Sequence, residues 1–427
     1  MTDETPRTLR ARCCIVGGGP AGMMLGFLLG RAGVETIVLE KHPDFLRDFR
    51  GDTVHPSTLA IMAELGLLDR FLARPHHKVD KITARFGDRV YTVADFARLK
   101  GTACPFIAFM PQWEFLDFLA DEAARFPAFR LRRSTEAVDL LRDGARVTGV
   151  RARDAQGDLT IAADLTVGCD GRASTVRAQA GLAVETLGAP MDVLWFRLGR
   201  RADAKPPEFA QVGGGHLLVC IDRGDYLQCA LVIAKGSLDA QRAKGIEAFR
   251  AVVTAIAPVL APGIGEIRDW DDVKLLTVAV DRLETWSRPG LLCIGDAAHA
   301  MSPIGGVGIN LAIQDAVATA NLLYPALASR APTEDELDAV RARRLFPTRV
   351  IQAIQVQIQN RLIAAVLEGE TAAPLPIRLA DALPRVQGLL ARAIGLGVRQ
   401  EHVEIPAAPS PAAGTAAGGV ASDTPRL

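Results

Sequence analysis

Two glycine-rich turns and one aspartate-glycine turn carry the residues of this chain best suited to chemistry. The first turn is Gly17-x-Gly19-x-x-Gly22, which lies between an apolar run and a helical pattern. The first glycine permits a tight turn, the second lets a pyrophosphate approach the backbone, and the third allows close helix packing. Glu40 follows the next apolar run, where a carboxylate accepts hydrogen bonds from ribose hydroxyls and repels a 2′-phosphate. The pattern predicts a dinucleotide site unsuited to NADP; the alternative is a glycine-rich turn without a ligand.

The second glycine-rich turn lies in "LLCIGDAAHAMSPIGGVGIN", residues 291–310. An apolar strand should deliver Gly295 and Asp296, where the carboxylate can accept from a sugar-like hydroxyl. The glycine loop and the helix after it would present N–H groups to a developing negative charge. A simple NAD dehydrogenase has no use for this loop, whereas FAD is long enough to reach it from Glu40 and becomes anionic at its pyrimidine edge when reduced. The loop and the helix start contain Pro303, Gly305, Gly306, Gly308 and Asn310.

The aspartate-glycine turn lies in "VGCDGRASTVRAQAG", residues 167–181. Asp170 and Gly171 follow a strand-like run, and Ser174 and Arg177 are placed to order the turn and its charge. The alternative is a capped helix start, in which Asp170 accepts only from backbone N–H groups.

In this order, GxGxxG with a glutamate after the second strand, DGxxSxVR and GDAAH…PxxGxGxN resemble the flavoprotein aromatic hydroxylases of the p-hydroxybenzoate hydroxylase fold. The motifs span about residues 13–320. The resemblance implies bound FAD, NAD(P)H as a transient reductant, and a flavin C4a-hydroperoxide that passes one oxygen atom from O2 to an aromatic or polycyclic small molecule. It also implies that no acid or base residue is needed to break the O–O bond.

The resemblance also implies a role for each turn. The first would bind the ADP half of FAD, the Asp170 turn would serve both FAD and the reductant, and Asp296 would hold the ribityl and pyrophosphate region. Pro303, Gly306 and Gly308 would surround the flavin ring. The full set expected to bind the cofactor is Gly17, Gly19, Pro20, Ala21, Gly22, Glu40, Lys41, Arg47, Arg50, Gln112, Asp170, Gly171, Gly295, Asp296, Gly308, Ile309 and Asn310.

Two members of this set have simple alternatives. Arg47 and Arg50 resemble the arginine loop of the family, yet exposed arginines on a polar loop would look the same. Gln112 resembles the residue that contacts the ribityl chain or the ring, but it could instead be a polar residue at a helix start.

Substrate contacts are poorly marked in the sequence. The candidates on the expected inserted sheet are Trp195, Phe196, His216, Tyr226 and Gln228, although a core or surface position in the sheet is favoured for each of them. His299 is tempting as a base, but it lies inside the GDAAH motif and a scaffold role is favoured. No set of residues matches a phenol or carboxylate site, which disfavours simple hydroxybenzoates.

The elements that must position these residues follow from hydrophobic periodicity. A strand at Cys13–Val16, a helix at Ala21–Arg31 and a strand at Glu35–Leu39 form a βαβ unit. Helices are expected over 57–71, behind a serine cap, and over 113–126. Period-two runs between about 193 and 280 predict an antiparallel sheet.

The predicted fold class is therefore α/β: a Rossmann-like FAD-binding domain with a parallel sheet, an inserted and mainly antiparallel substrate domain, and C-terminal helices. The FAD-binding domain would comprise residues 1–75, 100–185 and 280–365, and the substrate domain 76–99 and 186–279. Residues 366–404 would form a helical cap, and 405–427, rich in Ala, Pro and Gly, a disordered tail.

Composition limits the partners. Lys and Arg number 49 against 49 Asp and Glu, so no net charge attracts nucleic acid or an anionic membrane. Seven cysteines without a CxxC pair indicate reduced thiols in a cytoplasmic protein and no metal site. Residues 378–403 are a candidate for an amphipathic contact with a membrane surface. The chain could be a monomer or a homodimer.

Three other functions are compatible with parts of this pattern. A halogenase would carry a WxWxIP stretch, but the four tryptophans are isolated. A reductase of polyprenyl double bonds shares the fold, although the complete aspartate-glycine motif favours hydroxylation. A module that holds FAD or a ligand without turnover is the alternative outside enzymes.

Overall fold

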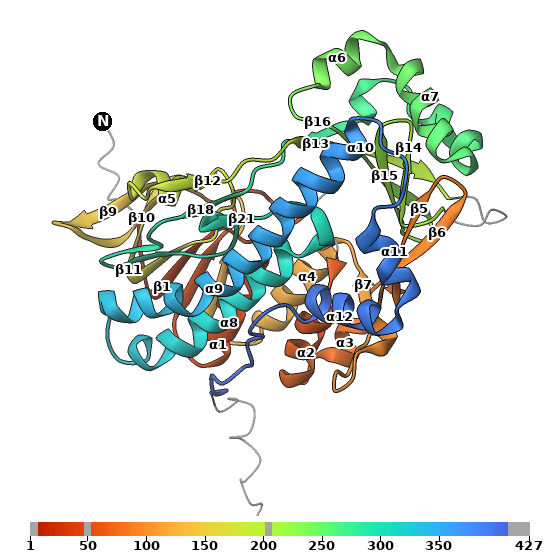
Figure 1. Cartoon of the computed structure of the whole chain (residues 1–427). Helices are drawn as coiled ribbons and strands as arrows, with labels where there is room; N and C mark the ends of the chain where they lie inside the picture. Colours follow the sequence, from red (N-terminus) through yellow and green to blue (C-terminus); the bar gives the residue numbers. More distant parts are fainter. Residues whose placement is uncertain (1–6, 47–52, 201–206, 409–427) are drawn as a thin grey trace, which may run out of the picture.

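The computed structural model describes residues 7–46, 53–200 and 207–408 (Figure 1). Its largest sheet has eight strands, with β19-β20-β11-β1-β2-β8 as the main order. The five parallel strands are β1 (Arg7–Val16), β2 (Thr36–Leu39), β8 (Phe129–Arg132), β11 (Gly157–Gly168) and β20 (Leu291–Cys293). The antiparallel strands are β19 (Ser287–Arg288), β10 (Arg146–Asp154) and β9 (Glu136–Asp143).

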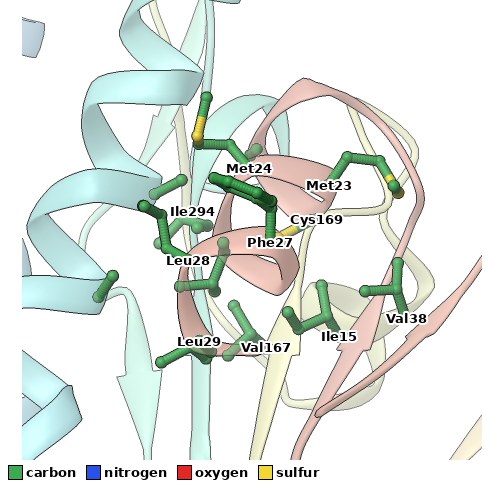
Figure 2. Close-up of a cluster of buried hydrophobic side chains, with 14 of the residues drawn as sticks. Ile15, Met23, Met24, Phe27, Leu28, Leu29, Val38, Val167, Cys169 and Ile294 are labelled. Atoms are coloured by element: carbon green, nitrogen blue, oxygen red, sulfur yellow. The ribbon is translucent and has the colours of Figure 1, made fainter. Parts of the chain in front are cut away.

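The helix α1 (Pro20–Arg31) is apolar on all sides, and every residue from 21 to 30 is buried. It packs against the strands of this sheet and against α8 (Gly308–Leu327) and α4 (Gln112–Ala123). Figure 2 shows Phe27 and Leu28 of α1 among Val167 and Ile294. A helix enclosed by a sheet and two helices has no solvent face, which explains why no charged residue precedes Arg31 at its end.

The second sheet has the order β17-β13-β16-β15-β14-β5-β6, and only the β14/β5 pair is parallel. Its outer face is covered by α7 (Ile246–Ile256). These two sheets confirm the predicted fold class, whereas the exact domain boundaries stay a prediction. The strands are β17 (Lys274–Leu276), β13 (Met191–Gly199), β16 (Tyr226–Ala234), β15 (His216–Asp222), β14 (Ala210–Gly213), β5 (Lys81–Phe86) and β6 (Arg89–Asp95).

Two three-stranded sheets lie outside these two larger sheets. One joins β3 (Thr53–Val54), β7 (Ile107–Phe109) and β4 (His77–Val79), so residues 77–79 do not pair with the second sheet. The other joins β12 (Val184–Thr186), β18 (Asp281–Leu283) and β21 (His299–Ala300).

The helix predicted over 57–71 is wrong in two respects. It is divided into α2 (Pro56–Glu64) and α3 (Leu68–Leu72), because Gly66 between them has a φ of +68°. Its cap position is His55, followed by Pro56 at the first helical position, so no serine caps it. Proline is favoured there because its missing N–H is not needed.

The C-terminal part begins with α9 (Glu334–Ile358), which extends from the first sheet toward the second (Figure 1). The stretch Glu334–Leu367 is long and apolar enough to cross a membrane by length and composition alone. It nevertheless buries Gln352 and Gln355, whose amides donate to the backbone carbonyls of Asp281 in β18 and of Ser302. Such buried polar contacts are expected of a helix packed inside a protein.

The chain then forms α10 (Ala364–Leu367), α11 (Leu375–Ala382) and α12 (Pro384–Gly395). Both α11 and α12 pack against β6. The tail predicted from residue 405 begins too early: Ile405 is buried in the main core, and the Ala408 N–H donates to Arg31 O at 2.9 Å. An isoleucine within an Ala/Pro-rich stretch provides the apolar anchor that composition alone does not show.

Candidate active site

Four parallel strands end side by side at one edge of the first sheet. Val16 pairs with Leu39 on one side and Gly168 on the other, and Gly168 pairs with Cys293. In open α/β sheets, ligands bind outside the carboxyl ends of the strands. The predicted site residues that follow these strand ends are Gly17, Glu40, Asp170 and Gly295.

The first glycine turn is closely packed except at one position. Gly17 has a φ of +107°, and a Cβ there would lie 2.4 Å from Cys169 O. A Cβ on Gly22 would lie 2.0 Å from Gly17 O, whereas one on Gly19 would meet no described heavy atom within 4 Å. Gly19 precedes Pro20 and Ala21 at the start of α1, and it has no side chain to cap the helix. The space beside Gly19 is therefore open and is bordered by the start of α1, whose free N–H groups suit an anionic pyrophosphate. We call this open turn the cradle.

Glu40 lies beside this cradle and is buried. Its Oε2 accepts from the Gly18 N–H at 3.2 Å, and its Oε1 accepts from the His42 N–H at 2.9 Å. The backbone thus orients the carboxylate toward the turn that a ribose would reach. The neighbouring Lys41 is exposed.

The aspartate-glycine turn is ordered by its own side chains. Asp170 Oδ1 accepts from Ser174 Oγ at 2.5 Å, and its Oδ2 accepts from the Val176 N–H at 3.1 Å. Burial raises the pKa of Asp170, while these hydrogen bonds act in the opposite direction. Ser174 caps α5 (Thr175–Gln179) by accepting from the Arg177 N–H. Asp170 therefore orders the turn, and Gly171, with a φ of +83°, borders open space among the described residues.

The three motifs contact one another. Arg172 Nε lies 3.2 Å from Asp296 Oδ2, and this contact joins the aspartate-glycine turn to the turn that carries Asp296. A Cβ on Gly295 would lie 3.1 Å from the Cβ of Ala21 and 3.3 Å from that of Ala312. The turn that carries Asp296 therefore lies between the starts of α1 and α8. Since Gly17 also contacts the second motif, the three form one site.

The late glycine loop is held from inside by Asn310. Its Oδ1 accepts from the His55 N–H at 2.9 Å and from Thr58 Oγ1 at 2.8 Å. Its Nδ2 donates to Thr53 O at 3.0 Å and Gly306 O at 3.3 Å. The side chain of Asn310 is thus engaged by protein, which leaves backbone N–H groups at the start of α8 as donors for a cofactor.

The loop itself demands glycine. Gly306 has a φ of +62°, and a Cβ there would lie 2.3 Å from Thr53 Oγ1, which donates to Gly306 O at 2.7 Å. A Cβ on Gly308, the first residue of α8, would meet only Met301 Cβ at 4.0 Å among described atoms, so the space beside Gly308 is open. Thr53 and His55 lie 253 and 255 residues away from their partners Gly306 and Asn310, and no sequence signal links them to this loop.

The remaining predicted residues divide into placed and undescribed ones. Pro303 is half-buried and precedes the turn Ile304–Gly306, while Gln112 is the half-buried first residue of α4. Arg47 and Arg50 lie outside the described residues.

The groups that are present fit FAD. Open space borders Gly19, Gly171 and Gly308, two helix starts supply N–H donors, and Glu40 and Asp296 supply acceptors for hydroxyl groups. Donors for phosphate and for an anionic ring edge, with carboxylates between them, match the chemistry of that cofactor from end to end.

On the substrate side, Trp195 and Phe196 point to opposite faces of β13. Trp195 is half-buried and packs against two apolar clusters: the first contains Phe109, and Ile304 of the glycine loop also packs against the second. Phe196 is fully buried under α7, with its ring centroid 5.3 Å from that of Phe249. Phe196 is therefore a core residue, the alternative favoured for it from the sequence, because α7 covers that face.

The other three substrate candidates have protein partners or lie at an edge. Tyr226 stacks under the guanidinium of Arg197, 3.8 Å from its ring centroid. Gln228 is buried and its Oε1 accepts from Arg223 Nε at 3.2 Å. His216 is half-buried where β15 begins.

His299 is a buried scaffold residue, and its Nε2 lies 2.6 Å from Asp315 Oδ2. The seven cysteines are free and buried, and burial raises the pKa of Cys14 to about 12, which keeps it an inert thiol. Within residues 7–46, 53–200 and 207–408, no group of three His, Cys, Asp or Glu side chains could hold a metal ion. A hollow of about 30 Å³ beside Ser57 and Gln314 has room for about one water molecule, and not for an organic substrate.

Comparisons with known proteins agree with this geometry. Residues 10–354 match the family model "FAD binding domain". The chain is 32% identical to 6-methylpretetramide 4-monooxygenase from Streptomyces rimosus, over 89% of this chain and 91% of that protein. It is 30% identical to rifampicin monooxygenase from Streptomyces venezuelae, over 81% of this chain and 70% of that protein.

Among solved structures, the OxyS anhydrotetracycline hydroxylase from Streptomyces rimosus superposes with a TM-score of 0.73 and 25% identity. The superposition covers 92% of this chain and 77% of that one. These matches confirm the resemblance drawn from the three motifs and the choice of FAD as the cofactor. The chain belongs to the FAD-binding-domain family and is an FAD-dependent monooxygenase of the p-hydroxybenzoate hydroxylase type.

Proposed function

We propose that this monooxygenase hydroxylates a polycyclic aromatic small molecule in the cytoplasm. The observation that carries the proposal is the apolar inner face of the second sheet, which packs with the glycine loop through Ile304. Strand alternation places Val193, Trp195 and Val232 on that face. Such a wall suits a large apolar ring system, and the names of several relatives refer to tetracycline-type or rifampicin substrates.

The chain's own residues would hold and orient the cofactor. N–H groups at the start of α1 would bind the pyrophosphate, and Glu40 and Asp296 would accept from ribose and ribityl hydroxyls. N–H groups of Gly308 and Ile309 at the start of α8 would stabilise negative charge at the pyrimidine edge of the ring. When bound, FAD supplies the redox chemistry: it accepts a hydride from NAD(P)H and delivers one oxygen atom of O2 to the substrate.

The remaining task of the protein is to exclude water from the reacting atoms. Pro303 and the glycine loop would cover one side of the ring, and the inner face with Trp195 would cover the substrate. No side chain of the described residues is assigned as acid or base, in keeping with the scaffold position of His299.

The test is a purified, FAD-loaded protein supplied with NADH or NADPH and a panel of aromatic compounds. We expect polycyclic phenols to accelerate reductant oxidation more than simple hydroxybenzoates do, and to gain one oxygen atom. Stimulation by hydroxybenzoates alone would contradict the proposed substrate class. A reduced or halogenated product would support the alternative activities of this fold.

A further inference from the structure

A buried chain of ionic contacts connects α8 to the turn that carries Asp296. Asp315 is fully buried, and its Oδ2 accepts from the Gly295 N–H at 3.1 Å and lies 2.6 Å from His299 Nε2. Its Oδ1 accepts from Arg344 Nε, a group of α9, at 2.9 Å. Asp315 therefore touches the cofactor turn with one oxygen and a buried cation with the other.

The chain continues into the C-terminal segment. Arg344 Nη1 lies 3.3 Å from Glu401 Oε1, and the side chains of both residues are almost completely buried. Burial acts to raise the pKa of Asp315, but His299 and Arg344 outweigh it and lower the pKa, so the carboxylate stays ionised. The three charged groups are thus mutually dependent, because a buried charge that loses its partner is costly.

Residues 399–405 form a strap along α8, and two polar side chains of that helix hold it there. The Glu401 N–H donates to Gln314 Oε1 at 2.5 Å. Two turns further along α8, Asn321 Nδ2 donates to His402 O at 2.7 Å, and Asn321 Oδ1 accepts from the Glu404 N–H at 3.0 Å. Glu401 is therefore delivered to Arg344 in a fixed position.

We propose that Asp315, Arg344 and Glu401 are positioning residues that hold the Gly295–Asp296 turn in its FAD-binding conformation, so that the strap sets the affinity for FAD. This inference rests on the proposed contact of that turn with FAD. Of the three residues, Asp315 contacts this segment directly, through the Gly295 N–H before Asp296 and through His299 after it. The strap is then a part of the cofactor site and not a separate cap.

The experiment measures FAD dissociation constants of deflavinated protein by the quenching of flavin fluorescence. Arg344→Gln and Glu401→Gln each raise the constant, on the order of tenfold, within the usual range of coupling between sites. Arg343→Gln is the matched control, because Arg343 pairs with the same carboxylate at 2.8 Å, is half-exposed, and is not bonded to Asp315 in the described structure. The control leaves the constant within about twofold.

A double variant separates positioning from general stability. Asp315→Asn combined with Arg344→Gln removes both charges and keeps an amide oxygen that can accept from the Gly295 N–H. Its FAD dissociation constant should be lower than that of Arg344→Gln alone. The inference is overturned if Arg344→Gln and Glu401→Gln lower the melting temperature of the apoprotein but bind FAD as the wild type does, or if the double variant binds no better. Failure of the wild type itself to bind FAD would instead refute the cofactor assignment.

Discussion

Arg172 Nε and Asp296 Oδ2 lie 3.2 Å apart, although 124 residues separate them in sequence. The pair is possible because Arg172 follows β11 and Asp296 follows β20, and these strands are neighbours in the parallel sheet. Each side chain is about one-third exposed, so the pair contributes little to stability. Its consequence is geometric: the Asp296 carboxylate is oriented before any ligand arrives.

Gly17→Ala should mainly lower the stability of the protein, whereas Gly19→Ala should mainly weaken FAD binding. Gly17→Ala places a Cβ against Cys169 O at a φ of +107°, so we expect a loss of stability on the order of 3 kcal/mol. Gly19→Ala meets open space at a φ of −75°, so we expect a stability change of about 1 kcal/mol or less. It should nevertheless weaken FAD binding at least about tenfold, because the methyl group occupies the approach of the pyrophosphate.

Urea unfolding of the apoproteins and FAD titration together check this pair. The cradle assignment fails if Gly19→Ala binds FAD as tightly as the wild type.

Glu40→Gln tests the ribose contact. The amide keeps the size of the side chain but lacks the charge, so we expect about a fivefold to tenfold rise in the FAD dissociation constant. Glu35→Gln is the control, because Glu35 is exposed at the other end of β2. Equal affinities of the two variants in a fluorescence titration would rule out the proposed role of Glu40.

Trp195→Ala and Phe196→Leu distinguish the two faces of β13. Trp195→Ala removes part of the apolar wall beside Ile304, so KM for a polycyclic substrate should rise about tenfold. Phe196→Leu alters only the packing under α7, which should cost roughly 1–2 kcal/mol of stability and leave KM unchanged. Steady-state kinetics on both variants decide the matter, and a raised KM in Phe196→Leu with unchanged Trp195→Ala would reverse the assignment.

The buried ring of His55 should make the stability of the folded protein depend on pH. Burial lowers the pKa of His55 from 6.5 to about 4, while its hydrogen bond to Ile394 O acts in the opposite direction. The folded protein thus keeps the ring neutral while the unfolded chain takes up a proton as the pH falls. The contribution of the neutral His55 ring to the free energy of unfolding is complete above pH 6.5. It is lost as the pH falls toward about 4, by at most about 1.4 kcal/mol per pH unit.

Unfolding free energies of the wild type and His55→Gln, measured from about pH 7.5 to about pH 5, isolate this contribution. Their difference should be largest at the higher pH and shrink as the pH falls. A difference that stays constant over this pH range would contradict the buried neutral ring.

Local patterns were sufficient for the first βαβ unit and its glycine turn, because the close approach of Gly22 to Gly17 and the hydrogen bond from Gly18 to Glu40 both join adjacent elements. The late glycine loop was also recognisable as a motif. Its support by Thr53 and His55 was not, since those hydrogen bonds join parts of the chain about 250 residues apart and leave no periodic signal.

Two features of the structure could not be predicted from the sequence, because both depend on tertiary packing: the covered face of β13 and the buried residues near the C-terminus. Alternation along β13 separates Trp195 from Phe196, but only the position of α7 shows which face is covered. The Ala- and Pro-rich C-terminus concealed Glu401 and Ile405, whose burial depends on α8 and α9 and not on the composition of their neighbours.

The protein should transfer one oxygen atom from O2 to an aromatic substrate, and product mass measured under isotopically labelled O2 follows that atom. With FAD-loaded protein, NAD(P)H and a polycyclic phenol, we expect a product that carries one labelled oxygen atom and is absent without the reductant. A product whose new oxygen comes from water, or reductant consumption without any oxygenated product across the panel, would contradict it.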